Sequence, residues 1–311
     1  MTVSERSQRR GLIIGCGGTL GAAWTVAALV AVRDVLDWDP RDAQLLMGTS
    51  AGAELVTMLG SGVDVDELVA MQLGTSAHPA LAHHLAAAPG RFPPLPAPAF
   101  PALPLVLRGS GLARPAGLLP RGRGDASWLK KLTNRLTEGC EWVNHPATWL
   151  VATDVSTGAR VAFGSPHAPQ APLSDALCAS WAIPGWFPPV RISGRDYLDG
   201  GAVSTASVDL ALDSGVQELV VIAPMASTGK IPGRGAHIAE RRLRNQMSEG
   251  LDREVALAES RGIRVLRLDA TPADLIVMGA NFMDGRRRLA TFEHALRSTR
   301  TQIDSKAGVL A

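Results

Sequence analysis

The sequence predicts an α/β protein, a three-layer α/β/α sandwich with a mostly parallel central sheet and an irregular, proline-rich cap. Short apolar runs alternate with segments of helical length, and glycine-rich turns join the first of them. The composition suits this class, because 311 residues with 46% hydrophobic and 19% charged side chains can bury a substantial core. We therefore expect one large folded domain with a cap rather than a disordered chain.

Two strand–helix units are expected near the N-terminus. The apolar run Leu12–Ile14 predicts a short buried strand, and Ala22–Leu36 has helical length and few breakers. Gln44–Met47 predicts a second strand, and Ala53–Leu59 predicts a helix that ends at a glycine. Three later apolar runs predict further strands separated by enough chain for crossover helices: Thr148–Thr153, Val216–Ile222 and Ile263–Leu268.

Residues 11–32 carry no charge and follow two arginines, so by length alone they could form a membrane span or an export signal. Their glycines argue against both. Four glycines fall within seven residues, where they would weaken a spanning helix but suit a tight strand-to-helix turn: Gly15, Gly17, Gly18 and Gly21. We expect this stretch to form a buried strand and a core helix.

Residues 77–124 differ from the rest of the chain. They are rich in proline, glycine and alanine around the run PPLPAPAFPALPLVL, and this composition predicts an irregular cap without regular helices. Two interpretations stay open for this segment. It is either a surface linker or a lid that shapes the entrance for a substrate.

Charge gives no electrostatic case for a nucleic-acid partner. The formal net charge is +2, from 31 basic and 29 acidic side chains. The arginine runs Arg241–Arg242 with Arg244, and Arg286–Arg288, lie in helical segments, and we interpret them as solvated helix faces. Nucleic acid is therefore excluded as an expected partner.

The three cysteines show neither paired nor metal-ligand spacing: Cys16, Cys140 and Cys178. We therefore expect no disulfide framework, no metal site and no cofactor. A reducing cytoplasm is the expected location, with peripheral contact at membranes as a further expectation. The oligomeric state is not predicted.

The strongest chemical signal is a G-x-S-x-G pentapeptide between an apolar strand and a helix, made by Gly48, Thr49, Ser50, Ala51 and Gly52. Such a nucleophile elbow holds its serine in a strained turn, and small neighbours relieve the crowding. The serine then lies at a helix N-terminus, where the dipole favours negative charge. The alternative is an ordinary turn in which the serine only caps the helix.

A glycine-rich loop, Gly15–Gly21, lies between the first strand and the first helix. Its glycines let backbone amides converge on one point, and Gly17 and Gly18 are the candidate donors to the oxyanion of acyl transfer, an interaction that lowers the barrier by roughly 3 to 4 kcal/mol. The competing interpretation is a phosphate or dinucleotide loop. The glycine spacing matches neither nucleotide fingerprint.

An acidic residue, Asp199, ends a short apolar run and precedes Gly200 and Gly201. A serine must lose its proton as it attacks, and an oriented carboxylate in a water-poor site can accept it. The neighbouring Asp196 is interpreted as a hairpin residue. Histidine is the usual base, but none of the seven histidines has a compelling local context. A Ser-Asp-His triad with His237 or His294 on an α/β-hydrolase fold stays open.

Together these elements resemble the patatin-like phospholipase family. Residues 15–21 are similar to its oxyanion loop, residues 48–52 to its nucleophile elbow and residues 199–201 to its D-G-[GA] motif. The run ASWAIPGWFPPV over Ala179–Val190 is similar to its A-S-x-A-x-P-x-x-F-P-P segment. The resemblance spans about Leu12 to Asp213. It implies a Ser50–Asp199 dyad without histidine, with Gly15, Gly21, Gly200 and Gly201 as supporting residues, and hydrolysis of lipid acyl esters.

Four residues depart from the family pattern. Cys16 stands where glycine is usual, and Leu20 stands where the family commonly has Arg or Lys, which makes phosphate-bearing lipids less certain substrates than neutral acyl esters. Thr205 and Ser207 replace the Asn and Pro of many relatives after the D-G-G motif. A non-hydrolytic lipid-binding protein and a nucleotide-binding protein are the alternatives from other functional classes.

The expected domain organisation follows from these motifs. We expect a disordered tail over residues 1–10, a catalytic domain over residues 11–223 that contains the cap, and a C-terminal α/β extension over residues 224–311 packed on the same domain. The chemistry expected is covalent acyl transfer, with a lipid or other acyl ester as the partner.

Overall fold

The computed structural model describes residues 9–99, 102–109, 113–227 and 238–310. Within these ranges eight strands form one mixed sheet in the order β5-β6-β3-β2-β1-β7-β8, with β4 paired to β3. The strands are β1 (Arg10–Ile14), β2 (Leu45–Thr49), β3 (Thr148–Asp154), β4 (Arg160–Phe163), β5 (Val190–Ile192), β6 (Arg195–Asp199), β7 (Glu218–Ala223) and β8 (Arg264–Asp269).

The centre of the sheet is parallel and one end is antiparallel. Strands β3, β2, β1, β7 and β8 are parallel neighbours, whereas β4 and β6 run antiparallel to β3 and β5 runs antiparallel to β6. The helices are α1 (Gly18–Leu36), α2 (Ala51–Gly60), α3 (Val65–Leu73), α4 (Leu103–Arg108), α5 (Ala113–Ala116), α6 (Ser127–Thr137), α7 (Leu173–Ser180), α8 (Ile238–Ser260), α9 (Pro272–Met278) and α10 (Arg288–Lys306).

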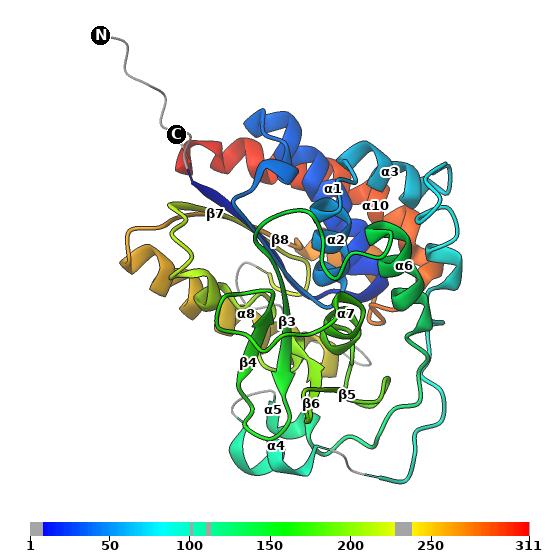
Figure 1. The fold of residues 1–311 in the computed structure, drawn as a ribbon. Helices are drawn as coiled ribbons and strands as arrows, with labels where there is room; N and C mark the ends of the chain where they lie inside the picture. Colours follow the sequence, from blue (N-terminus) through cyan, green and yellow to red (C-terminus); the bar gives the residue numbers. More distant parts are fainter. Residues whose placement is uncertain (1–8, 100–101, 110–112, 228–237, 311) are drawn as a thin grey trace.

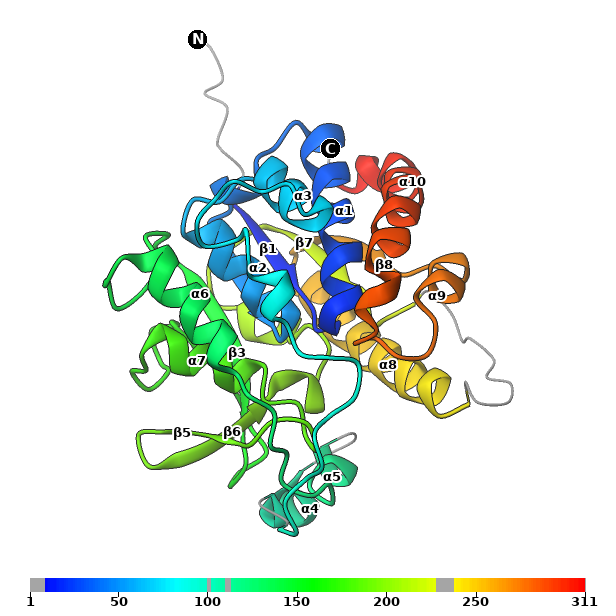
Figure 2. The same cartoon turned by 90° about the vertical axis from the view of Figure 1, so that its right-hand side faces the viewer.

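Helices cover both faces of the parallel part of the sheet, which makes three layers. Figures 1 and 2 show α1, α2, α3 and α10 on one side and α8 on the other. Successive side chains of β1 point to opposite faces of the sheet. Leu12 and Ile14 lie in the core cluster that contains Trp24 of α1, whereas Ile13 lies in the cluster that contains Leu251 of α8. The predicted α/β/α sandwich with a mostly parallel sheet is confirmed.

Helix α1 is long and apolar enough to cross a membrane by length and composition. In the fold, 67% of that apolar window is buried, and the helix packs against α2, α3 and α10. A core helix and a membrane span share the same composition, because both are hydrophobic nearly all round. The burial of α1 among these helices accounts for its apolar sequence as core packing.

Several element boundaries differ from the expected ones by a few residues. Strand β1 begins at Arg10, which was assigned to a disordered tail; Arg10 pairs with the buried carboxylate of Glu218 on β7 at 2.9 Å. Residues 1–8 lie outside the described residues. Helix α1 begins at Gly18, four residues before the expected Ala22, because the glycine-rich loop itself forms the first helical turn.

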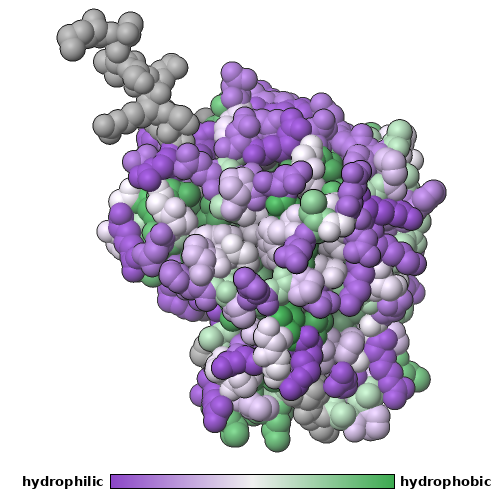
Figure 3. All heavy atoms as spheres, viewed as in Figure 1, coloured by the Kyte–Doolittle hydropathy of each residue, from purple (hydrophilic) through white to green (hydrophobic). Residues whose placement is uncertain are grey.

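The expectation that the cap contains no regular helices is wrong. Residues 103–108 and 113–116 form the short helices α4 and α5, which pack against each other and project from one end of the molecule (Figures 1 and 2). Pro104 lies in the first turn of α4, where a missing N–H costs no intrahelical hydrogen bond. Figure 3 shows hydrophobic surface at this end of the molecule.

The chain after residue 223 contributes to the same sheet and layers. Strand β8 pairs with β7 in parallel over six residues, and α10 packs beside α1 and contacts β8. Helix α8 covers the other face of the sheet. The elements on either side of residue 223 belong to one core. The division of the chain at residue 223 stays a prediction.

Candidate active site

Three chain segments that are distant in sequence meet at the carboxyl ends of β1, β2 and β6. The register of β3 explains the meeting. Thr49 at the end of β2 lies opposite Val151 of β3, and Asp199 at the end of β6 lies opposite the next residue, Ala152. Ser50 and Asp199 are therefore delivered to neighbouring positions at one edge of the sheet. The end of β1 pairs with Gly48, so the glycine-rich loop begins at the same edge.

Ser50 lies in a strained turn between β2 and α2. Its φ and ψ angles are 58° and −123°, a conformation that a residue with a Cβ adopts at a cost. The turn is so tight that a Cβ at Gly48 would lie 2.3 Å from the carbonyl oxygen of Gly52, and a Cβ at Gly52 would lie 2.1 Å from that of Ile14. Both glycines are thus required by close approach of the backbone, as expected for a nucleophile elbow.

Ser180 holds the backbone of this turn in place. Its hydroxyl accepts a 2.9 Å hydrogen bond from the Ser50 amide and donates one of 2.6 Å to the carbonyl of Val151 on β3. Ser180 is fully buried at the end of α7. The sequence run over residues 179–190 contained this serine, but its local pattern gave no sign of this role.

The glycine-rich loop presents unused amides to the site. Gly18 adopts a φ of +56°, and a Cβ there would lie 2.5 Å from the ring of Phe282, so only glycine fits. Among the hydrogen bonds of the described residues, none is donated by the amide of Gly17 or Gly18. Helices α1 and α2 both begin at the site, and the positive ends of their dipoles favour a developing negative charge.

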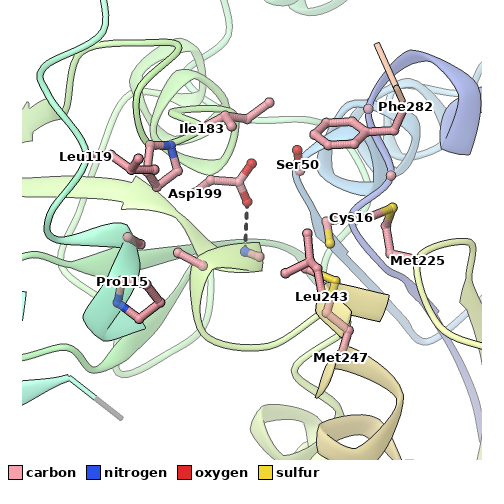
Figure 4. A pocket seen from close by; sticks show the side chains of 16 residues that line it. Cys16, Ser50, Pro115, Leu119, Ile183, Asp199, Met225, Leu243, Met247 and Phe282 are labelled. Carbon is pink, nitrogen blue, oxygen red and sulfur yellow. Dashed lines mark hydrogen bonds between the residues drawn. The ribbon is translucent and has the colours of Figure 1, made fainter. Parts of the chain in front are cut away.

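The Asp199 carboxylate is buried at the end of β6. It accepts a 2.8 Å hydrogen bond from the amide of Gly201, shown as the dashed line in Figure 4. Burial raises the pKa of Asp199 to about 7, while the hydrogen-bonding influence of Ser50 and the Gly201 amide opposes that rise. A carboxylate with a pKa near neutrality suits a general base that must be ionised and still accept a proton.

The Ser50 and Asp199 side chains face the same cavity (Figure 4). The serine hydroxyl lies near enough to the Asp199 carboxylate to lower its pKa through hydrogen bonding. The arrangement therefore permits a proton to pass from the serine hydroxyl to the carboxylate.

Two residues that depart from the family pattern contact each other beside the dyad. The amide of Cys16 donates to the carbonyl of Thr205 at 2.8 Å, and their side chains lie 3.4 Å apart. Burial, and then the nearby charge of Asp199, raise the pKa of the Cys16 thiol to about 12. The thiol is therefore neutral, which is the unreactive form of a cysteine. Thr205 thus anchors the start of the loop in which Cys16 stands where glycine is usual.

The site opens into a cavity of about 400 Å³ with an almost entirely apolar wall. Figure 4 shows two sides of this wall with the Ser50 and Asp199 side chains between them. Among the described residues neither lysine nor arginine lines it, so this part of the lining offers no cation for a pyrophosphate or a phosphate head group. The lining residues are Cys16, Gly17, Gly18, Ser50, Pro115, Ala116, Leu119, Ile183, Pro184, Asp199, Gly201, Ala202, Met225, Leu243, Met247 and Phe282.

Sequence reasoning missed much of this wall. Leu243 and Met247 come from α8 and Phe282 from the loop before α10, in the part of the chain for which the motifs gave no function. Leu243 and Met247 are four residues apart and lie on one face of α8, and this spacing indicates only an amphipathic helix. From the cap, Pro115 and Leu119 join the wall, so residues 77–124 contribute to the cavity rather than only linking two elements.

Of the predicted site residues, Ser50, Asp199, Gly17, Gly18 and Gly201 line the cavity. The others support it from behind: Gly15 packs on the carbonyl of Thr205, Gly21 on Pro224 and Gly200 on the carbonyl of Val151, while Thr49 ends β2 and the buried Ala51 begins α2. Their catalytic roles stay predictions that the arrangement permits.

The described histidines lie away from the cavity. His84 is buried and hydrogen-bonds to Glu54 at 2.8 Å, His145 bonds to the carbonyl of Ala43, and the histidine at position 294 lies near Asp274. His237 lies outside the described residues. Within the described ranges, therefore, the lining of the cavity supplies a carboxylate and not an imidazole beside Ser50.

The two acids near Asp199 have structural contacts. Asp154 at the end of β3 accepts hydrogen bonds from the amide and hydroxyl of Ser156 and pairs with Arg195, so it organises the turn to β4. Asp196 lies in the β5–β6 hairpin and pairs with Arg191, as expected of a hairpin residue. Both therefore act within the fold at the sheet edge.

The interpretation of Arg244 as part of a solvated helix face is wrong. Its side chain is 1% exposed, pairs with Glu240 and donates a 2.7 Å hydrogen bond to the carbonyl of Pro224. The Pro224 ring packs on the oxyanion loop, since a Cβ at Gly17 would lie 2.8 Å from it. Burial lowers the pKa of Arg244, which the charge of Glu240 opposes. A buried cation thus braces the loop in which Leu20 replaces the usual basic residue.

Removing this brace is expected to lower kcat about tenfold, with KM changed by less than about twofold, because the misplaced amides would stabilise the transition state less. The variant is Arg244→Met combined with Glu240→Gln, which avoids leaving a buried charge unpaired. Arg244→Lys, whose ammonium can still donate to the Pro224 carbonyl, is the matched control and should retain most activity. Equal kcat values for the wild type and the methionine variant would contradict the bracing role.

Comparison with known proteins agrees with this geometry. The model of the family described as patatin-like phospholipase matches residues 12–212, which is more than half of the chain and contains Ser50, Asp199 and the glycine-rich loop. Among solved structures the chain is similar to VipD from Legionella pneumophila, with 15% sequence identity, a TM-score of 0.48, and coverage of 98% of this chain and 69% of that chain. On the family match, this chain belongs to the patatin-like phospholipase family.

Proposed function

We propose that this protein hydrolyses carboxylic acyl esters of lipids, with Ser50 as nucleophile and Asp199 as its base. Membership of the patatin-like phospholipase family supports a lipid acyl hydrolase function. The observation that carries the finer proposal is the convergence of Ser50, Asp199 and the free amides of the glycine-rich loop on one apolar cavity.

The proposed reaction has two halves. The Ser50 oxygen attacks the ester carbonyl carbon as its proton passes to Asp199, and the amides of Gly17 and Gly18 hold the oxyanion. Collapse of this intermediate breaks the bond to the alcohol, which takes the proton from Asp199 and leaves. Water then attacks the acyl-enzyme with Asp199 again as base, and the free acid is released while Ser50 regains its proton.

The cavity favours an acyl chain over a charged group. Its wall is made of leucine, methionine, isoleucine, proline and phenylalanine side chains, and burying each methylene of a chain there is worth about 0.8 kcal/mol. Because Leu20 is buried and the described lining residues include no cation, we propose neutral acyl esters as better substrates than phosphate-bearing lipids. The chemistry requires no metal or cofactor, and a cytoplasmic location is part of the proposal.

A fluorophosphonate probe tests the nucleophile directly. We expect the wild-type protein to react with one equivalent of probe and the mass shift to map to the peptide that contains Ser50, because the strained turn exposes an activated hydroxyl. Prior incubation with a p-nitrophenyl ester should slow labelling by occupying the site. Labelling at another residue, or no labelling of folded protein, would reject this assignment.

A further inference from the structure

The cap combines exposed apolar side chains with unpaired positive charge. Among the described residues, twelve large apolar side chains are exposed to solvent by about two fifths or more, and six of them lie in residues 77–124. Leu95 is 86% and Leu107 77% exposed. The six are Phe92, Leu95, Leu103, Leu107, Leu118 and Leu119. A concentration of this kind on a monomer marks a binding surface rather than random exposure.

The charge of the cap is entirely of one sign. Residues 77–124 contain five arginines and no lysine, aspartate or glutamate, whereas the whole chain carries a formal charge of only +2. All five arginines are exposed, and none forms an ion pair with a carboxylate among the described residues. They are Arg91, Arg108, Arg114, Arg121 and Arg123. The cap therefore presents unneutralised positive charge beside its exposed apolar groups.

This surface runs into the active-site cavity. Leu119 is 44% exposed and also lines the cavity, and Pro115 and Ala116 of α5 line the same wall. Helix α4, which carries Leu103 and Leu107, packs against α5 at the end of the molecule (Figures 1 and 2). Figure 3 shows hydrophobic and hydrophilic residues mixed at this end.

We propose that the exposed leucines and arginines of the described part of the cap dock the cavity entrance on an anionic lipid surface. Arginines attract anionic head groups, and leucines beside them enter the boundary between head groups and acyl chains. An ester in that layer would then reach Ser50 along the apolar wall without first being extracted into water. The proposal rests on the proposed function for its purpose, since it names the surface from which the acyl ester is taken.

Vesicle binding tests the docking without hydrolysis. The Ser50→Ala protein is mixed with vesicles of phosphatidylcholine alone or with vesicles in which about one third of the lipid is phosphatidylglycerol, at low and at high salt. The fraction of protein that sediments with the vesicles is measured. We expect binding to the anionic vesicles, weakened by salt. In this background, Arg121→Glu with Arg123→Glu should weaken binding about tenfold or more, because each basic residue near the surface contributes about fivefold to the attraction. Leu95→Glu with Leu107→Glu should weaken binding by a similar factor, because the apolar contact with the acyl chains is lost.

Matched controls lie elsewhere on the surface. Ile276→Glu changes a 75% exposed side chain on α9, and Arg297→Glu reverses an exposed charge on α10, so both should bind vesicles like the parent. The same substitutions in active protein should leave turnover of the water-soluble ester p-nitrophenyl butyrate unchanged. Vesicle binding that is absent, or equal in cap and control variants, would overturn the docking.

Other outcomes separate this proposal from the proposed function. Vesicle binding that depends on the cap in a protein without esterase turnover would support docking and reject the hydrolase. Turnover of the soluble ester without vesicle binding would do the reverse. If Leu95→Glu with Leu107→Glu changed only the oligomeric state seen by size-exclusion chromatography, the cap would be a contact between copies of the chain, and the lipid surface would be rejected.

Discussion

Replacing Ser50 by alanine is expected to reduce turnover of p-nitrophenyl esters by at least about 10⁴-fold, because the acyl-enzyme can no longer form. The residual rate would come from the oxyanion donors and binding alone. The elbow geometry does not depend on the hydroxyl, since the Ser50 side chain makes no capping hydrogen bond to α2. The unfolding midpoint should therefore change little, and circular dichroism should show an intact fold.

The variant Ser50→Gly is a second, independent test of the role of Ser50 and of the strain in its turn. Glycine adopts a positive φ without strain, so this variant should be equally inactive but more stable by about 1 kcal/mol in urea unfolding. Greater stability together with lost turnover would indicate that the protein maintains a costly conformation for the nucleophile. Retention of a large part of the turnover in either variant would mean that another group attacks the ester.

Replacing Asp199 by asparagine is expected to lower kcat by about 10³- to 10⁴-fold, because the amide cannot accept the serine proton while it can still accept the hydrogen bond from Gly201. The wild-type rate should rise with pH through about 7, where Asp199 ionises, and the rise should be absent in the variant. Rate profiles with a soluble ester would measure both. A wild-type rate that is flat through this range would contradict Asp199 as the base.

The same substitution should stabilise the fold at high pH. Asp199 has a pKa of about 7 in the folded state against 3.8 as its ordinary value, so the folded state binds the proton more tightly. Stability is therefore lost as pH rises from about 4 to about 7, and the cost above that range is on the order of 2 to 4 kcal/mol. We expect Asp199→Asn to unfold at higher urea than the wild type in alkaline buffer and at similar urea in acid.

Local motifs led to Ser50, Asp199 and the glycine-rich loop, which the fold brings to one cavity, because the constraints on these residues are local. Gly48 and Gly52 are required by close backbone contacts at the turn, and Gly17 and Gly18 by close contacts of one loop. Because only glycine fits such positions, these requirements are visible in the sequence. The alternation of apolar runs predicted the sheet for the same reason. What the motifs could not give was the register that places Asp199 beside the elbow, since it depends on the pairing of β3 with both β2 and β6.

The residues that were missed act through contacts between distant segments. Arg244 and its neighbours look like any basic helix, and only the fold shows that this side chain is buried behind the loop at residues 15–21. The proline content of the cap argued against helices, but Pro104 lies where a helix tolerates it. Apolar lining residues such as Leu243 carry no signal that separates a cavity wall from ordinary core packing.

One wall of the cavity comes from chain beyond the region that the family model matches. Leu243, Met247 and Phe282 all follow residue 212, while Ser50, Asp199 and the glycine-rich loop precede it. A protein shortened to the matched region would keep Ser50 and Asp199 but lose this wall. Substitutions in the C-terminal part of the chain can thus reshape the cavity of this protein without altering either residue.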